Sequence, residues 1–142
     1  MIPTFPVRLA DRADIPALMR IRAAVRENVL RDPARVPAET YGRFIDDHGL
    51  WLWEEAGRIL GFSAADRADG TVWALFVDPA EEGRGIGRLL LSTVLDDLRR
   101  SEWARARLTT QPGSRAERFY RRAGWSAAGV ADDGDLILET AL

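Results

Sequence analysis

The sequence predicts a mixed α/β fold in which a sheet of about seven strands is accompanied by four helices. Apolar runs of strand length alternate with segments of helical spacing, and clusters of Gly, Pro and Asp separate them. No internal repeat or long linker divides the 142 residues, so we expect one compact domain over residues 1–142. The expected element order is β-α-α-β-β-β-α-β-α-β-β.

The N-terminal half is expected to contain a strand, two helices and a hairpin. The predicted elements are an edge strand within residues 3–9, a helix capped by Asp11 or Asp14 with Ile15, Leu18, Arg22 and Val25 on one face, a helix over about 37–47, and strands over 50–55 and 59–65 around the turn Ala56-Gly57.

The C-terminal half is expected to alternate strands and helices before a final hairpin. Residues 71–77 are almost wholly apolar, which is typical of a central strand covered on both faces. The later elements are a helix with Ile86, Leu89, Leu90, Thr93, Val94 and Leu98 at helical spacing, a strand over 105–110, a helix capped by Ser114, and strands over 125–130 and 136–140.

Three residue types restrict the chemistry available to this chain. All 20 basic residues are arginine, cysteine is absent, and His48 is the one histidine. These counts exclude a Schiff-base lysine, a phosphate-loop lysine, a thiol nucleophile and a thiolate metal site, and no metal site is expected. An enzyme of this composition is expected to take its reactive group from a cosubstrate.

Charge and hydropathy narrow the expected partners. The net charge of −2 gives no basic excess of the kind that nucleic-acid binders carry, so no nucleic-acid partner is expected. No run approaches the ~20 apolar residues of a membrane span, and the first ten residues lack the layout of a signal peptide. A cytoplasmic protein that binds no membrane is therefore expected.

A glycine-rich segment is the strongest local signal. Gly83, Gly85 and Gly87 lie between a predicted strand and a predicted helix, where unpaired backbone N–H groups attract phosphate. Arg84 and Arg88 would add charge beside that turn. A Walker loop would need a lysine, and a Rossmann turn would follow the first strand. A glycine turn that binds nothing remains the alternative.

Two motifs in the C-terminal half resemble a known family. The segment from Glu82 to Gly87 is similar to the Gln/Arg-x-x-Gly-x-Gly/Ala signature of the GCN5-related N-acetyltransferase (GNAT) family, with glutamate at the first position. A second motif, near Asn-x-x-Ala-x-x-Phe-Tyr-x-x-x-Gly-Phe/Trp, is matched at Ala116, Phe119, Tyr120, Gly124 and Trp125, with Gly113 in place of asparagine.

The resemblance implies a mostly antiparallel GNAT fold and direct acetyl transfer from acetyl-CoA to a primary amine of a small molecule or peptide. The residues Gly83, Arg84, Gly85, Ile86, Gly87 and Arg88 would then hold the pyrophosphate, and Leu75, Phe76 and Val77 would pair their backbone with the pantetheine arm. Tyr120 would protonate the departing thiolate. A purely structural role in the core is the alternative for Tyr120.

The acceptor side is less defined. By the same resemblance, Glu27, Asn28 and Trp73 would line the acceptor site, although a tryptophan on a strand is also typical of a core. No carboxylate occupies the positions where many relatives carry a general base, and a water relay is one alternative. A CoA-binding module with little catalysis and a phosphate- or nucleotide-binding regulatory domain remain open, as does a homodimer.

Overall fold

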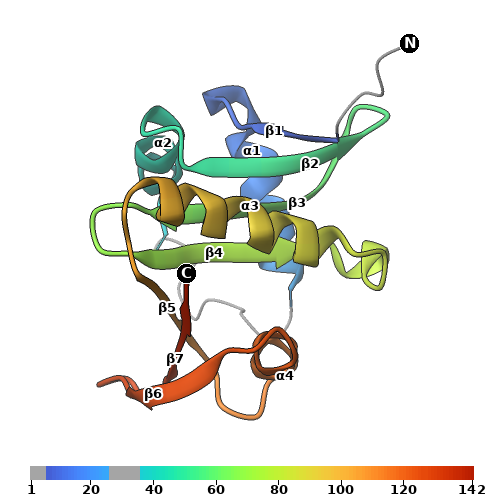
Figure 1. Ribbon diagram of the computed structural model, residues 1–142. Coiled ribbons are helices and arrows are strands. Elements are labelled where there is room, and N and C mark those ends of the chain that lie inside the picture. The colour runs from blue at the N-terminus through green and yellow to red at the C-terminus, as the bar shows by residue number, and fades with distance from the viewer. Residues whose placement is uncertain (1–5, 26–35) are drawn as a thin grey trace.

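The computed structural model describes residues 6–25 and 36–142 (Figure 1). Each predicted strand and helix has a counterpart in it. The elements are β1 (Val7–Leu9), the 3₁₀ turn η1 (Arg12–Asp14), α1 (Ile15–Ala24), α2 (Ala38–Asp46), β2 (Leu50–Glu55), β3 (Arg58–Asp66), β4 (Thr71–Val77), the 3₁₀ turn η4 (Pro79–Glu81), α3 (Ile86–Arg100), β5 (Arg105–Thr110), α4 (Arg115–Arg122), β6 (Ser126–Val130) and β7 (Leu136–Ala141).

The seven strands form one sheet in the order β1-β2-β3-β4-β5-β7-β6. Among the strands of the described residues, only β4 and β5 pair in parallel, and α3 makes the crossover between them. All the other neighbouring strands are antiparallel. The predicted mixed, mostly antiparallel sheet with four helices is therefore confirmed.

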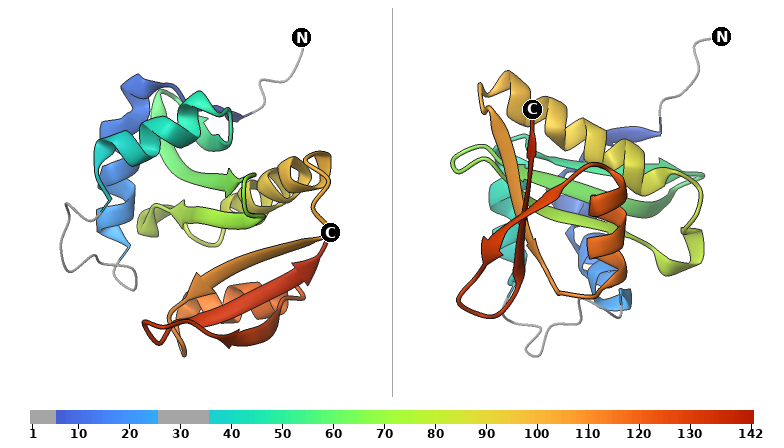
Figure 2. Two further views of the ribbon diagram at one scale, coloured as in Figure 1. Left: turned by 90° about the vertical axis from the view of Figure 1, so that its left-hand side faces the viewer. Right: turned by 60° about the horizontal axis from the view of Figure 1, so that its bottom comes forward.

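Helices cover the two faces of the β1–β4 part of the sheet (Figure 2). Buried residues of α1 and α2 share a hydrophobic cluster with Phe62 and Phe76 from β3 and β4. On the opposite face, an added Cβ at Gly61 in β3 would lie 3.1 Å from Leu90 and 3.3 Å from Ile86, both in α3. The absence of a side chain at Gly61 therefore lets α3 pack closely on the sheet.

The C-terminal strands make a second part of the sheet, which diverges from the first. Residues of α3 and α4 meet there in one cluster with Leu108 of β5, Leu138 of β7 and Trp125. Strands β4 and β5 pair in register at one position, Thr71 with Arg107. Beyond that pair the two strands separate, and the sheet opens along the C-terminal part of β4.

Strand β4 departs from the sequence expectation in two ways. Its burial alternates instead of being complete, because Leu75 and Val77 on one side are half-buried and line a cavity. The strand also contains a bulge: Ala64 pairs with Ala74 while Ala65 pairs with Val72, so Trp73 is the extra residue. The bulge places Trp73 in the same cluster as its neighbour Ala74, on the α1–α2 face.

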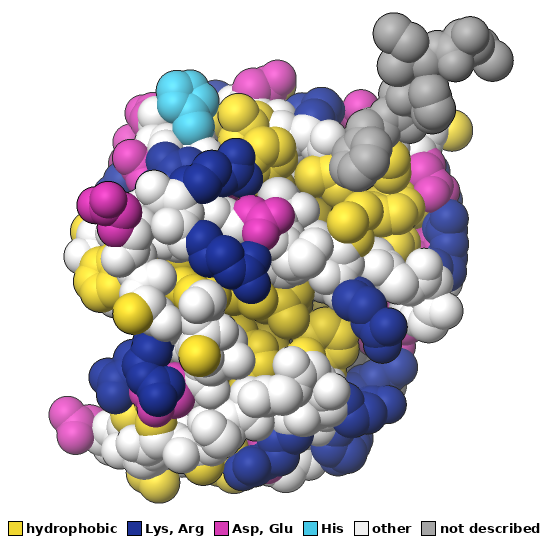
Figure 3. All heavy atoms as spheres, in the orientation of Figure 1, with side chains coloured by type: hydrophobic (Ala, Val, Ile, Leu, Met, Phe, Trp, Pro, Cys, Tyr) yellow, Lys and Arg dark blue, Asp and Glu magenta, His cyan; other side chains and the backbone are white. Residues whose placement is uncertain are grey.

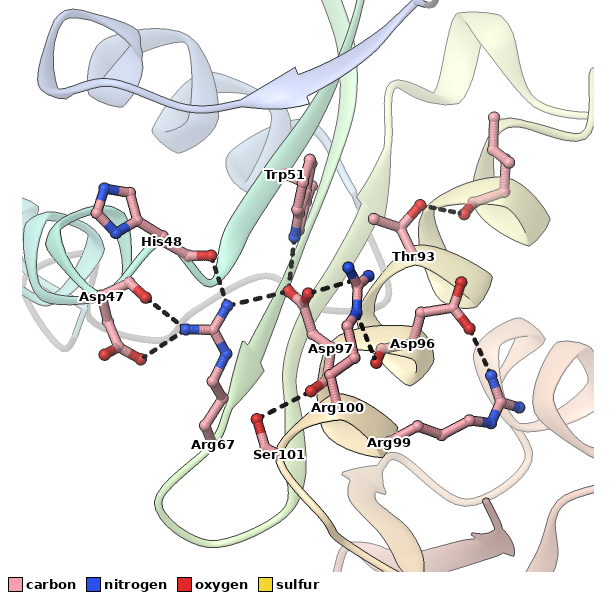
Figure 4. Close-up of polar contacts among 11 residues, drawn as sticks. Asp47, His48, Trp51, Arg67, Thr93, Asp96, Asp97, Arg99, Arg100 and Ser101 are labelled. Atoms are coloured by element: carbon pink, nitrogen blue, oxygen red, sulfur yellow. Dashed lines mark hydrogen bonds and ion pairs between the residues drawn. The ribbon is translucent and has the colours of Figure 1, made fainter.

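A buried carboxylate fastens α3 to the sheet (Figure 4). Asp97 accepts a 2.7 Å hydrogen bond from Trp51 Nε1 of β2 and lies 3.5 Å from Arg67 in the β3–β4 loop. Arg67 also donates to the backbone carbonyls of Asp47 and His48 after α2. One network therefore joins α3, β2, the α2–β2 loop and the β3–β4 loop.

In the described part of the chain, no helix is both long and apolar enough to cross a membrane.

Candidate functional site

A cavity of about 690 Å³ opens where β4 and β5 separate. Figure 3 shows hydrophobic side chains at the floor of a hollow between the upper and lower parts of the molecule, with arginines around it. Five elements converge on this cavity: the ends of α1 and β4, the turn η4, the beginning of α3, and α4. Its lining comprises Ala24, Val25, Leu75, Phe76, Val77, Pro79, Glu81, Glu82, Gly83, Gly85, Ile86, Gly87, Arg88, Arg115, Ala116, Phe119 and Tyr120.

The glycine turn forms the wall of the cavity at the N-terminus of α3. Gly83 and Gly85 both have φ of 82°, a backbone conformation that side-chain-bearing residues rarely adopt. An added Cβ at either position would meet nothing within 4 Å, so both face open space. Gly85 is the N-cap of α3 and no side chain caps the helix. The first N–H groups of α3 therefore remain available to an anion.

Of the two arginines in the glycine segment, Arg88 lines the cavity and Arg84 does not. Arg88 lines the cavity and forms no ion pair within residues 6–25 and 36–142. The side chain of Arg84, expected to add charge at the site, is not part of the lining and instead contacts Glu55 at 2.7 Å and Glu81 at 2.8 Å. These two hydrogen bonds raise the pKa of the Arg84 guanidinium. The cationic side chain offered by the glycine segment is therefore that of Arg88.

Acidic side chains at the cavity are paired with arginine. Glu81 contacts Arg84, and Glu82 pairs with Arg115 of α4, across the cavity mouth. Glu82 stands where the family signature has Gln or Arg, and it links the glycine turn to α4. Within the described residues, neither of these carboxylates is an unpaired base.

The β4 wall carries backbone groups without a strand partner. Since β5 pairs with β4 only at Thr71, the β5-facing N–H and C=O groups of Leu75–Val77 face the cavity instead of a neighbouring strand. Leu75, Phe76 and Val77 all line the cavity. An extended ligand with amide groups could pair with this edge as an added strand.

Tyr120 closes the cavity from α4. Its ring packs edge-on against Phe119 and Trp125, with centroids 5.2 and 5.4 Å apart, and belongs to the cluster shared with α3. The residue is 7% exposed, and burial raises the pKa of its phenol. Tyr120 is therefore both a core residue and a cavity-lining residue whose phenol stays protonated.

None of the residues expected on the acceptor side is a described lining residue of the main cavity. Trp73 stacks on Phe44 with centroids 4.3 Å apart and lines a second hollow of about 310 Å³ with Thr71, Val72, Arg107, Leu108, Thr109 and Ile137. Glu27 and Asn28 lie outside the described residues. His48 is exposed and lines neither hollow.

The sequence interpretation expected Glu27 and Asn28 at the acceptor site but did not identify Ala24 and Val25 as cavity residues. Ala24 and Val25 line the cavity from the end of α1. Small apolar residues at a helix end carry no chemical signal, so only the tertiary contact reveals them. A signal was present one turn earlier, where Arg22 occupies an otherwise apolar helix face.

Part of this chain is similar in sequence to two known acetyltransferases. Over 93 residues, 61% of this chain, it is 31% identical to the mycothiol acetyltransferase of Beutenbergia cavernae, of which the match covers 31%. Over 96 residues, 62% of this chain, it is 28% identical to the peptidyl-lysine N-acetyltransferase YiaC of Escherichia coli, of which 63% is covered. The chain thus spans less than two thirds of either relative.

A solved structure shares the fold almost end to end. The PaiA N-acetyltransferase from Thermoplasma acidophilum, in complex with coenzyme A, superposes with a TM-score of 0.81 at 14% identity, covering 96% of this chain and 98% of that one. The family model of the acetyltransferase (GNAT) family matches residues 16–125, more than half of the chain. The chain belongs to the acetyltransferase (GNAT) family.

Proposed function

We propose that this protein is an acetyl-CoA-dependent N-acetyltransferase that transfers an acetyl group directly to a primary amine of a small molecule or peptide. The observation that carries the proposal is the cavity of about 690 Å³ along the unpaired part of β4, with the N-terminus of α3, which no side chain of the described residues caps, at one end. Family membership supports the same reaction. The proposal assigns the complete site to one domain over residues 1–142.

The cavity fits acetyl-CoA in shape and charge. The open glycine turn and Arg88 are suited to the pyrophosphate, because backbone N–H groups at the start of α3 and a guanidinium both favour anions. The unpaired edge of Leu75–Val77 is suited to the amide-bearing pantetheine arm. An N–H of this edge is also a suitable donor to the carbonyl oxygen of the acetyl group as it gains negative charge.

Tyr120 is the residue proposed to protonate the leaving thiolate. Tyr120 lines the cavity, and its raised pKa keeps the phenol protonated throughout the neutral range. Acetyl-CoA supplies the activated acyl group, so the chain needs no nucleophile of its own. The absence of cysteine and lysine is consistent with this division of roles.

A second candidate function is a CoA-binding module with little catalysis. It is favoured by the pairing of Glu81 and Glu82 with arginines, which leaves no unpaired carboxylate on the described cavity wall to deprotonate an amine. For an active enzyme we expect water to accept that proton, or a residue outside the described part of the chain such as Glu27.

A thiol-release assay separates the two candidates. The purified chain is incubated with acetyl-CoA and a panel of amino acids, polyamines, aminoglycosides and lysine-containing peptides, and the acetylated product is identified by mass spectrometry. An enzyme releases thiol and an acetylated amine in equal amounts. Binding of acetyl-CoA without release above the hydrolysis rate for any acceptor would favour the module.

A further inference from the structure

Arg22 is a charged residue in an apolar position. It lies on α1 on the side of Ile15 and Leu18, which are buried against the sheet. The Nε and Nη1 atoms of Arg22 are buried and have no hydrogen-bond partner among residues 6–25 and 36–142. No carboxylate forms an ion pair with Arg22 in the described part of the chain, and a buried cation without a counter-charge is costly.

Aromatic residues surround the guanidinium but leave its Nε and Nη1 atoms without an acceptor. Its Cζ atom lies 4.8 Å from the ring centroid of Phe76 and 5.5 Å from that of Trp73. Tyr41 packs edge-on against Trp73, and burial raises the pKa of Tyr41 while the charge of Arg22 and a side-chain hydrogen bond with Arg22 oppose that rise. Ring faces attract a cation, yet in-plane N–H groups still require an oxygen acceptor.

Arg22 contacts one lining residue of each hollow, although it lines neither hollow itself. Phe76, 4.8 Å from the guanidinium, lines the main cavity, and Trp73, 5.5 Å from it, lines the second hollow. The next residues of the chain, Ala24 and Val25, also line the main cavity. The bulge in β4 turns Trp73 toward α1 and so creates this aromatic surround.

We infer that Arg22 binds a carboxylate carried by the amine acceptor, an inference that rests on the proposed acetyltransferase function. The phosphates of acetyl-CoA have their own site at the glycine turn and Arg88, whereas Arg22 lies on the α1–α2 face of β4. The acceptor class is therefore amino acids and other small amines that carry a carboxylate near the amine. A guanidinium forms strong, directional hydrogen bonds with that group.

Matched acceptors test the inference by activity. Each standard amino acid is compared with its α-carboxamide under saturating acetyl-CoA. Wild-type protein is expected to favour the carboxylate by about tenfold or more in kcat/KM. Arg22→Gln removes that preference by slowing only the carboxylate member, and Arg22→Lys restores part of it. Arg20→Gln, at an exposed position on the same helix, leaves the preference unchanged. Equal activity on both members of every pair would overturn the inference.

A binding measurement tests the same inference without turnover. The Nε–H resonance of Arg22 is identified in protein loaded with CoA by its absence from Arg22→Gln, whose melting temperature verifies folding. Addition of the amino acids is expected to shift this resonance with at least one of them, and their carboxamides leave it in place. If no carboxylate shifts it at millimolar concentration, the assignment of Arg22 is wrong, whatever the activity assay shows. If the shift occurs without thiol release, Arg22 stands and the proposed function fails.

Discussion

Tyr120 is 7% exposed on the cavity wall, and burial raises the pKa of its phenol. A higher pKa makes the phenol a weaker acid, but it guarantees that the proton is present at neutral pH. The leaving thiolate is a base of similar strength to free cysteine, so a neighbouring phenol can protonate it as the carbon–sulfur bond breaks. In the proposed reaction, the side chain therefore combines a packing role with a chemical one.

Tyr120→Phe separates these two roles because it keeps the ring and removes the hydroxyl. We expect kcat to fall about 100-fold, the lower range for loss of a general acid, with little change in the KM for acetyl-CoA. Steady-state thiol release at several pH values measures this. The Tyr120 hydroxyl makes no hydrogen bond within the described residues, so the melting temperature should stay close to that of wild type. An unchanged kcat would remove Tyr120 from the reaction.

Arg88 and Arg84 form a matched pair four residues apart. Arg88 lines the cavity, whereas Arg84 is held by Glu55 and Glu81 outside it. Arg88→Ala is expected to raise the KM for acetyl-CoA about tenfold, the effect of one charge-assisted hydrogen bond. Arg84→Ala removes exposed ion pairs and should change that KM less than about threefold. A larger effect from Arg84→Ala than from Arg88→Ala would contradict the position assigned to the phosphates.

At the scale of elements, α3 is fixed at both ends by different means. Its N-terminal turn packs through Gly87, where an added Cβ would lie 3.5 Å from Val77 and 3.7 Å from Phe119. Its C-terminal half is held by Asp97, whose side chain is 6% exposed and contacts Trp51, Arg67 and Arg100 (Figure 4). Since the glycine turn leads directly into α3, the position of this helix sets the position of the anion site.

Asp97→Ala is expected to lower the free energy of unfolding by about 2–3 kcal/mol, because Trp51 Nε1 loses its acceptor and two arginines lose a counter-charge. Asp96→Ala is the matched control. Asp96 is exposed and pairs only with Arg99 among the described residues, so its loss should change stability by less than about 0.5 kcal/mol. Urea unfolding of both variants measures the difference. Equal stabilities would show that the Asp97 network contributes nothing.

The sequence predicted the elements well where local patterns determine them. The apolar run 71–77 and the alternating run 105–110 coincide with β4 and β5, and the Ser114 cap begins α4 as expected, with its hydroxyl accepting from Glu117 N. The sequence did not reveal the bulge at Trp73, because a bulge depends on the register of the neighbouring strand.

The sequence predicted those parts of the candidate site that local motifs determine, and it missed the parts that depend on long-range contacts. The glycine turn, the β4 segment and Tyr120 all line one cavity, and each follows from a local motif. The side chain of Arg84 lies outside it because Glu55, 29 residues away in sequence, attracts it. Side-chain contacts between residues so far apart in the sequence cannot be predicted from the spacing of residues within a local motif. Arg22 was visible as a charge on an apolar helix face, but its aromatic neighbours come from β4.

At the scale of the whole molecule, the composition leaves few side chains that can change charge at alkaline pH and so alter the stability of the fold. The chain has no lysine and no cysteine, so Tyr41 and Tyr120 are the only side chains with ordinary pKa values between about 9 and 12. Burial raises the pKa of both in the folded protein, although Arg22 partly opposes this at Tyr41. Their contribution to stability is therefore complete below the unfolded pKa and lost as pH rises toward the folded values.

We expect the melting temperature to stay level up to about pH 9.5 and to fall above about pH 10, where tyrosines of the unfolded chain ionise. Circular dichroism between pH 7 and pH 12 follows this directly. The double variant Tyr41→Phe/Tyr120→Phe should extend the level range upward. A decline that begins below pH 9, or one that the double variant retains, would show that other groups control it.

Calorimetric titration with acetyl-CoA tests most directly whether the cavity between β4 and β5 is the acetyl-CoA site. The predicted result is one molecule bound per chain, weakened by Arg88→Ala and almost unchanged by Arg84→Ala, with no measurable binding of ATP or NAD under the same conditions. Absence of binding at millimolar acetyl-CoA, or equally strong binding of ATP, would contradict the proposed function.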